Sequence, residues 1–223
     1  MTSWLRKLED ILWPRGLKCI CCDEYAQGEP LCPDCRQALE AMRLSRGQAG
    51  DDQVRSVFRY DGTAKQLVLA LKLENVADAG IPLADAMAET VREMQLPPDT
   101  VLTWVTMPDI RRRQRGIDHG RRLCEAVAAR AGLPAQQLLS RTGRFHTQRG
   151  FSREERLRNL DGTVVCNVSV TTPVLLIDDV LTTGATISVC AESLLKAGAP
   201  AVFALTATKV KISTDHSNEY QKG

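Results

Sequence analysis

The stretch VLLIDDVLTTGAT, residues 174–186, decides how this sequence is interpreted. Its apolar residues 174–177 predict a short buried strand, and residues 185–198 predict the helix that follows. In a parallel sheet, ligands bind beyond the carboxyl ends of the strands. Asp178 and Asp179 are therefore expected at such an end, where two carboxylates are tolerable near hydrogen-bond donors or a cation.

The threonine and glycine residues after this acidic pair suit an anion. Backbone N–H groups at the start of a helix favour negative charge, and Gly184 lets the backbone approach a ligand closely. The residues expected to form the cradle are Thr182, Thr183, Gly184, Ala185 and Thr186. A phosphate cradle beside two acceptors for a diol has the shape that a ribose 5-phosphate requires.

Strand-like and helix-like segments alternate on both sides of this stretch. Strands are expected over residues 54–60, 101–107, 163–170, 174–177 and 201–208, and helices over 61–72, 81–94, 121–132 and 185–198. This alternation predicts an α/β domain with a mostly parallel sheet flanked by helices. The polar stretch 43–52 is expected to be a linker. We place an N-terminal helix and a cysteine module at 1–50, and the α/β domain at 51–223.

Composition excludes several classes of protein. Hydrophobic residues make up 43% of the 223 residues, which is enough for a core. No apolar run approaches the ~18 residues that a membrane span needs, and the start of the chain lacks a signal-peptide core. The first 16 residues favour an amphipathic helix packed on the protein, with a membrane-surface helix as the alternative. The protein is expected to be soluble and cytoplasmic.

Five of the eight cysteines fall between Cys19 and Cys35. Two Cys-x-x-Cys pairs at this spacing can converge tetrahedrally on one zinc ion, which would supply much of the local folding free energy. Two disulfides or a redox pair are the alternatives, which a cytosolic location and the tandem arrangement disfavour. Cys21 has the wrong spacing and is a spare thiol. The expected ligands are Cys19, Cys22, Cys32 and Cys35, and the expected core thiols are Cys124, Cys166 and Cys190.

Charge is distributed unevenly along the chain. Residues 111–158 hold thirteen arginines, no lysine and four acidic residues. This asymmetry predicts a site for anions, because arginine forks bind phosphate oxygens bidentately. Nucleic acid is the alternative anion, although this region has few aromatic residues on which bases could stack.

The stretch 174–186 resembles, over its whole length, the phosphoribosyl-diphosphate signature of the type I phosphoribosyltransferases. The resemblance implies a type I phosphoribosyltransferase-like fold. It also implies that Asp178 and Asp179 are catalytic residues that bind the ribose 2′- and 3′-hydroxyls, and that the loop 182–186 holds the 5′-phosphate. Magnesium is then expected with the diphosphate.

From Cys19 to about residue 208 the chain resembles the ComF family, in which a four-cysteine module, similar to a double zinc ribbon, precedes such a domain. The matching segments are YDGTAKQLVLALK (60–72), MPDIRRRQRGIDHGRRL (107–123) and QRGFSREERLRNLDG (148–162). Two positions depart from the pattern: the usual Lys-Tyr is Lys72-Leu73, and a usual glutamine is His119. The resemblance implies a link to competence, DNA uptake and DNA utilisation.

The same resemblance assigns roles to the arginine-rich segments. The loop after the first core strand is implied to contact diphosphate, through Arg111, Arg112, Arg113 and Arg115. A later basic stretch is implied to be a flexible loop that closes over the substrate, with Gln148, Arg149, Ser152, Arg153 and Arg156 as its site residues. A solvated basic turn and a nucleic-acid contact are the alternative interpretations.

Two functions follow from these observations. The first is a ComF-family protein that binds phosphoribosyl diphosphate with magnesium and acts as a phosphoribosyltransferase of unassigned acceptor. The second is a non-catalytic single-stranded-DNA-binding protein of the DNA-uptake machinery, which would use the zinc module and the arginine-rich loops. Expected partners are therefore phosphoribosyl diphosphate, single-stranded DNA and other DNA-uptake proteins.

Overall fold

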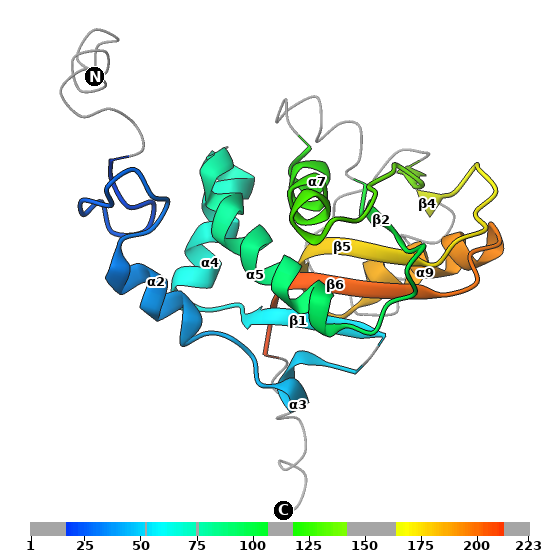
Figure 1. The fold of residues 1–223 in the computed structure, drawn as a ribbon, viewed down its shortest axis with the longest axis horizontal. Helices are drawn as coiled ribbons and strands as arrows, with labels where there is room; N and C mark the ends of the chain where they lie inside the picture. Colours follow the sequence, from blue (N-terminus) through cyan, green and yellow to red (C-terminus); the bar gives the residue numbers. More distant parts are fainter. Residues whose placement is uncertain (1–16, 52, 75, 107–117, 142–163, 212–223) are drawn as a thin grey trace, which may run out of the picture.

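The computed structural model describes residues 17–51, 53–74, 76–106, 118–141 and 164–211 (Figure 1). Three predicted features lie outside these ranges: the N-terminal helix, the four arginines between 111 and 115, and the flexible-loop residues between 148 and 156. Within the described residues, no helix is both long enough and apolar enough to cross a membrane.

Four strands form one parallel sheet. They are β1 (Val54–Arg59), β2 (Val101–Trp104), β5 (Val174–Leu181) and β6 (Val202–Lys209). Their order is β1-β6-β5-β2, and each neighbouring pair is parallel. The last of these strands in the sequence inserts between the first strand and β5. As a result β5 and β6 are central strands, which explains their nearly continuous apolar runs.

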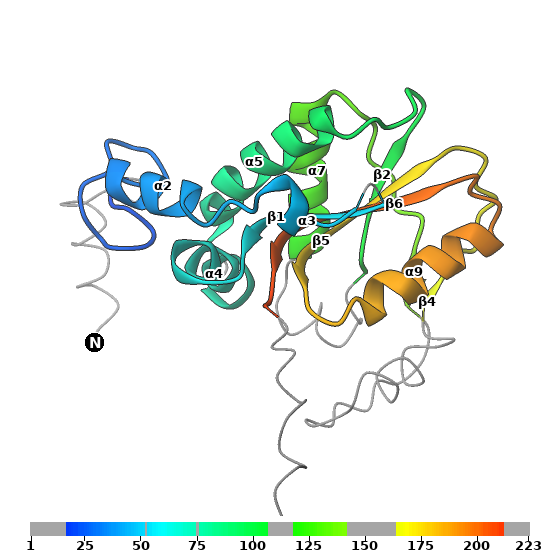
Figure 2. The same cartoon turned by 90° about the horizontal axis from the view of Figure 1, so that it is seen from below.

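Helices cover both faces of the sheet (Figure 2). Helices α5 (Gly80–Glu93) and α7 (His119–Ala131) pack against each other on one face, and α9 (Ala185–Lys196) lies on the opposite face. Helix α7 ends as predicted at Gly132, whose φ of 71° is left-handed. The predicted architecture, a parallel sheet flanked by helices, is confirmed.

The segment between β1 and α5 is helical throughout most of its length. It contains α4 (Gly62–Leu69), the π-helical turn η1 (Ala70–Glu74) and the 3-10 turn η2 (Ala77–Ala79). Asp61 caps α4, because its Oδ1 accepts a hydrogen bond from the Gly62 N–H at 2.9 Å. This segment follows β1 and therefore starts at the carboxyl edge of the parallel sheet.

Side chains alternate between the two faces along β5. Leu175 and Ile177 join the core under α5 and α7, whereas Val174 and Leu176 join a second core under α9. All four are fully buried. Successive side chains of a strand point to opposite faces of the sheet, so each β5 side chain packs against the helices on one face.

The third predicted strand differs from the structure. The strand expected over 163–170 is reduced to β4 (Val164–Val165), which pairs antiparallel with β3 (Ser140–Arg141) outside the main sheet. Further along the predicted strand, the Val170 N–H bonds to the Ala197 carbonyl, at the end of α9, instead of to a neighbouring strand.

The predicted linker over 43–52 is also wrong in part. It contains the short helix α3 (Arg46–Ala49), which begins with a Ser45–Gln48 capping box. Arg43 and Gly50 form isolated bridges with β1, so this segment covers part of an exposed strand edge. Covering such an edge prevents pairing with other chains, which gives this polar stretch a structural role.

The cysteine-rich segment lies at one end of the molecule beside α2 (Pro33–Glu40) and α4 (Figure 1). Helix α2 contacts α4, and apolar side chains such as Leu31 and Leu39 join the core under α5 and α7. The segment is therefore packed onto the α/β part of the chain. The division at residue 50 stays a prediction.

Candidate functional site

The carboxyl ends of β2 and β5 form a topological switch point. In chain order β2 leads to α7 on one face, and β5 leads to α9 on the opposite face (Figure 2). In open α/β sheets, ligands bind in the crevice between two such ends. Pairing of β2 with β5 stops at Trp104 and Ile177, whereas β5 runs alongside β6 as far as Leu181. Asp178 and Asp179 therefore lie beyond the last β2 pair.

Strand β5 is longer than predicted. The prediction ended at Ile177, but the strand includes both aspartates and ends at Leu181. The polar residues stay in the strand because β6 supplies them with ladder partners, including Thr206 opposite Asp178. The acidic pair still lies toward the carboxyl edge of the sheet, where β2 has already ended.

The two aspartates have different partners. Asp179 Oδ1 forms an ion pair with the Nζ atom of Lys72, from η1, at 2.7 Å. Asp178 Oδ1 accepts a hydrogen bond from the Asp179 N–H at 2.9 Å, and the alternation along β5 turns Asp178 toward α9. Thr208 Oγ1 donates to the Asp179 carbonyl at 2.9 Å. The acidic pair is therefore held by contacts from β6 and from η1.

The protonation state of Asp178 is unusual. Burial, and next the charge of the Asp179 carboxylate, raise the pKa of Asp178 to about 8, while the Asp179 N–H and the charge of Lys72 oppose the rise. Asp178 is therefore mostly protonated at pH 7 in the ligand-free protein. A protonated carboxyl can donate a hydrogen bond as well as accept one, which suits a hydroxyl ligand. A carboxyl group perturbed in this way at a crevice marks a candidate site.

Thr182, Thr183 and Gly184 connect β5 to α9. Gly184 is the N-cap of α9 with a φ of 78°, a left-handed conformation that glycine adopts readily. Thr183 Oγ1 accepts a hydrogen bond from the Ala185 N–H at 3.4 Å. The predicted cradle residues thus occupy the N-terminus of a 12-residue helix directly after the acidic pair, a position that favours an anion.

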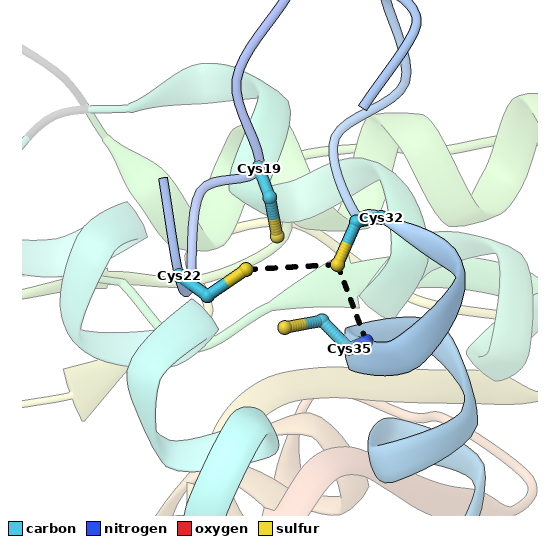
Figure 3. Close-up of side chains that lie close together, drawn as sticks. All are labelled: Cys19, Cys22, Cys32 and Cys35. Atoms are coloured by element: carbon cyan, nitrogen blue, oxygen red, sulfur yellow. Dashed lines mark hydrogen bonds between the residues drawn. The ribbon is translucent and has the colours of Figure 1, made fainter. Parts of the chain in front are cut away.

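Four sulfur atoms converge near the start of the described chain (Figure 3). The Sγ atoms of Cys19, Cys22, Cys32 and Cys35 all lie within 4.8 Å of one another, and those of Cys22 and Cys32 are 3.6 Å apart. Four thiolates bound tetrahedrally at about 2.3 Å from one zinc ion lie about 3.8 Å apart. The donor set and the spacing therefore fit a single zinc ion. Cys21 does not belong to this cluster.

Local backbone hydrogen bonds shape each cysteine pair. Cys19 N–H donates to the Glu24 carbonyl at 2.7 Å, and the Cys19 carbonyl accepts from the Asp23 N–H at 3.0 Å. Cys32 is the N-cap of α2, and its Sγ accepts from the Cys35 N–H at 3.5 Å. These hydrogen bonds turn the backbone at each Cys-x-x-Cys pair, so that the two sulfur atoms of a pair point in the same direction. A metal ion bound by both pairs needs this arrangement.

The thiols of this segment differ in acidity. Burial opposes ionisation of Cys19, but backbone N–H groups of Cys32, Cys21 and Cys22 lower its pKa to about 7. Burial and the neighbouring sulfur atoms raise the pKa of Cys21 to about 12. Burial also raises the pKa of Cys35, so the position of the sulfur atoms, and not the acidity of the thiols, separates the four proposed ligands from Cys21.

Two of the three remaining cysteines are core residues as predicted. Cys124 and Cys190 are fully buried. Cys166 is only partly buried, and its Sγ lies 3.4 Å from the Val168 carbonyl oxygen. The prediction holds only in part for Cys166, which packs against the core under α9 from the loop that follows β4.

Some polar groups near the crevice were not singled out from the sequence. Lys72 contacts Asp179 across two elements that are far apart in the chain. Trp104 Nε1 and Thr106 Oγ1, at the end of β2, are buried without a hydrogen-bond partner in the part of the chain that the structure describes. Buried polar groups usually have partners, so both are candidates for contacts with a ligand.

Comparisons with known proteins bear on identity. No family model matches the chain. The chain is 28% identical to the DNA utilization protein YhgH of Salmonella typhi, over 89% of this chain and 92% of that protein. It is 27% identical to the protein of the same name from Salmonella typhimurium, with the same coverage.

Several solved structures share part of the strand and helix arrangement. Glutamine phosphoribosylpyrophosphate amidotransferase from B. subtilis gives a TM-score of 0.40 at 18% identity, covering 58% of this chain and 26% of that chain. Adenine phosphoribosyltransferase from Leishmania donovani gives 0.38 at 14% identity, covering 82% of this chain and 86% of that one. The Leishmania tarentolae enzyme gives 0.38 at 15% identity, covering 64% and 75%. At TM-scores this low, likeness of fold carries no functional argument.

Proposed function

We propose that the crevice at the ends of β2 and β5 binds phosphoribosyl diphosphate, and that the protein is a phosphoribosyltransferase of unassigned acceptor. The observation that carries this proposal is the acidic pair Asp178 and Asp179 at the topological switch point, followed directly by the loop that opens α9. The hydroxyls of a sugar diol need hydrogen-bond donors and acceptors, and a 5′-phosphate needs backbone N–H groups. The carboxyl end of β5 offers the carboxyl groups of the acidic pair and the N–H groups at the start of α9.

Each part of the site has a role in this proposal. The two aspartates bind the ribose 2′- and 3′-hydroxyls, orient the sugar, and offset positive charge that develops on the ring. The loop from Thr182 to Thr186 holds the 5′-phosphate. A nucleophile forms its bond to the anomeric carbon as the bond to diphosphate breaks. Magnesium, bound with the diphosphate, neutralises part of the charge of this leaving group.

The arginine-rich segments complete the proposed site. Arg111, Arg112, Arg113 and Arg115 belong to the connection that follows β2, which begins where the Val105 N–H bonds to the Ile177 carbonyl at 3.2 Å. Arginines in this connection suit the diphosphate because their forks bind phosphate oxygens bidentately. The residues proposed to close over the bound substrate are Gln148, Arg149, Ser152, Arg153 and Arg156.

The test is thermal unfolding with and without phosphoribosyl diphosphate and magnesium. A ligand at a hundred times its dissociation constant adds about 2.7 kcal/mol to the free energy of unfolding, so the wild-type melting temperature should rise by several degrees. The double variant Asp178→Asn, Asp179→Asn should gain nothing. Asp99→Asn, at an exposed aspartate before β2, is the matched control and should gain as much as wild type. If the melting temperature of the wild-type protein does not rise with the ligand, the proposal is wrong.

A second candidate function is the binding of single-stranded DNA by a protein that acts with other DNA-uptake proteins. Two observations favour it: the similarity to proteins named DNA utilization protein, and the thirteen arginines between residues 111 and 158. Binding of this kind releases counterions. Raising salt from about 50 to 200 mM should therefore weaken oligonucleotide binding on the order of a hundredfold.

The matched variants for this candidate are two sets of arginines. Arg112→Ala with Arg113→Ala should make the salt dependence shallower, because fewer phosphates are neutralised. Arg92→Ala, at an exposed position on α5, lies outside both the zinc module and the arginine-rich segments and should leave it unchanged. Oligonucleotide affinity that does not respond to salt would exclude electrostatic DNA binding.

We further propose that Cys19, Cys22, Cys32 and Cys35 hold a structural zinc ion. The convergence of their sulfur atoms supports this role. Residues 1–50 would then form a zinc module and residues 51–223 the phosphoribosyltransferase-like domain. A reducing compartment such as the cytoplasm would keep the thiols available to the metal.

A further inference from the structure

Lys72 makes a contact that the proposed roles do not use. Its Nζ atom lies 2.7 Å from Asp179 Oδ1, and the side chains are only 30% and 14% exposed. In the described part of the chain, no second ion pair reaches Asp178 or Asp179. Because both partners are partly shielded from water, the pair is screened less than an ion pair on the open surface.

The π-helical turn η1 presents Lys72 to the sheet. It follows α4 and takes in residues Ala70–Glu74. Leu71 is buried, whereas Leu73 is 67% exposed, so the turn has one side against the core and one side in water. Lys72 lies between them and is half-buried. A π turn inside a helical segment often occurs at a functional site.

The ion pair of Lys72 with Asp179 changes the net charge of the site. Two ionised aspartates beside a phosphate cradle would repel a phosphorylated ligand. Lys72 neutralises Asp179, and burial keeps Asp178 mostly protonated below about pH 8. On the α9 side, the buried Cys190 thiol interacts electrostatically with Asp178 and with Arg141. Together Lys72, Asp178 and Asp179 therefore carry a net charge close to zero at pH 7.

We propose that Lys72 is the counter-ion of the acidic pair and a positioning residue for Asp179, which makes the site selective for an anionic, phosphorylated sugar. The inference rests on the proposed function for the identity of that sugar. The contact of Lys72 Nζ with Asp179 Oδ1 holds this carboxylate in place at the crevice. It also links the η1 turn to β5, so that a helical segment outside the sheet takes part in the site.

Three variants test this role in the full-length protein. Lys72→Met removes the charge and keeps much of the side-chain length, Lys72→Arg keeps the charge, and Lys65→Met is the control at an exposed lysine on α4. The first readout is calorimetric affinity for phosphoribosyl diphosphate with magnesium. We expect Lys72→Met to bind about tenfold more weakly, the other two variants to stay within about threefold of wild type, and all three to melt like wild type.

The second readout needs no ligand. The carboxyl ¹³C shift of Asp178, assigned by its loss in Asp178→Asn, reports the titration of this group. Because the charge of Lys72 favours the ionised form of Asp178, Lys72→Met should move the titration midpoint to higher pH. Lys72→Arg and Lys65→Met should leave it near the wild-type position. A lysine with a merely structural role would not produce this pattern.

The two readouts separate the inference from the proposed function. If wild type binds the ligand, and Lys72→Met binds equally well with an unmoved Asp178 titration, Lys72 is an incidental ion pair and the inference is wrong. If wild type does not bind, the proposed function fails, and the ligand-free titration alone decides whether Lys72 sets the charge of the pair. A shifted midpoint supports that role, and an unshifted one overturns it.

Discussion

Replacing Cys32 by serine should remove the bound metal and unfold the cysteine segment. Cys32 is 5% exposed, caps α2, and lies 3.6 Å from Cys22 Sγ. Structural zinc contributes about 10–16 kcal/mol to the folding of small zinc-binding peptides, so losing one of four ligands is expected to cost several kcal/mol locally. Metal analysis should find one zinc ion per wild-type chain and almost none in Cys32→Ser, and hydrogen exchange should show loss of protection over residues 17–40.

Cys21→Ser is the matched control for this experiment. Cys21 is next to Cys22 in the chain and partly buried, but its sulfur is outside the four-sulfur cluster. We expect this variant to retain its zinc and its protection from exchange. Equal metal loss in Cys21→Ser and Cys32→Ser would show that the ligand set is wrong, and wild-type protein without metal would contradict the zinc site altogether.

Loss of the metal should also affect the crevice at the ends of β2 and β5. Helix α2 contacts α4, and α4 continues into η1, which holds Lys72 against Asp179. If Cys32→Ser loosens α2, the position of Lys72 becomes less defined. We infer that the zinc module stabilises the helical segment that supplies one side of the proposed site.

The features that could be predicted from the sequence are those whose chemistry is local. The cysteine pairs converge because two residues between cysteines allow one turn to bring both sulfur atoms together. The loop from Thr182 to Gly184 opens α9 because an apolar strand, a glycine and an amphipathic run follow one another directly. In both cases a short segment carries the whole signal.

The features that could not be predicted depend on distant neighbours. Strand β5 extends to Leu181 only because β6 lies beside it and pairs to that depth, and a sequence does not show which strand will be the neighbour. Lys72 reaches Asp179 from a π turn, and the sequence does not show that this turn will lie beside β5. Residues 43–50 are polar and therefore predict a linker, but Arg43 and Gly50 form bridges with the exposed edge of β1. The sequence does not show which strand edge will be exposed.

Replacing Asp178 by asparagine should stabilise the ligand-free protein, and the gain should grow with pH. The pKa of Asp178 is raised from an ordinary 3.8 to about 8, chiefly by burial. Between these values the folded state holds a proton that the unfolded state has released, so the wild-type free energy of unfolding falls as pH rises. The loss is about 1.4 kcal/mol for each pH unit and ends near pH 8. Asparagine remains neutral, and its Oδ1 can still accept from the Asp179 N–H.

Denaturant unfolding of the full-length protein at several pH values from about 5.5 to 8.5 measures this effect. The difference between Asp178→Asn and wild type should widen up to pH 8 and then level off, whereas Asp99→Asn should follow wild type throughout. Acid-induced loss of zinc affects all three proteins alike and cancels in the comparison. Parallel curves for Asp178→Asn and wild type would mean that Asp178 is not protonated in the fold. A widening difference would show that the chain tolerates a destabilising carboxyl at the switch point, as expected when a residue is retained for binding and not for stability.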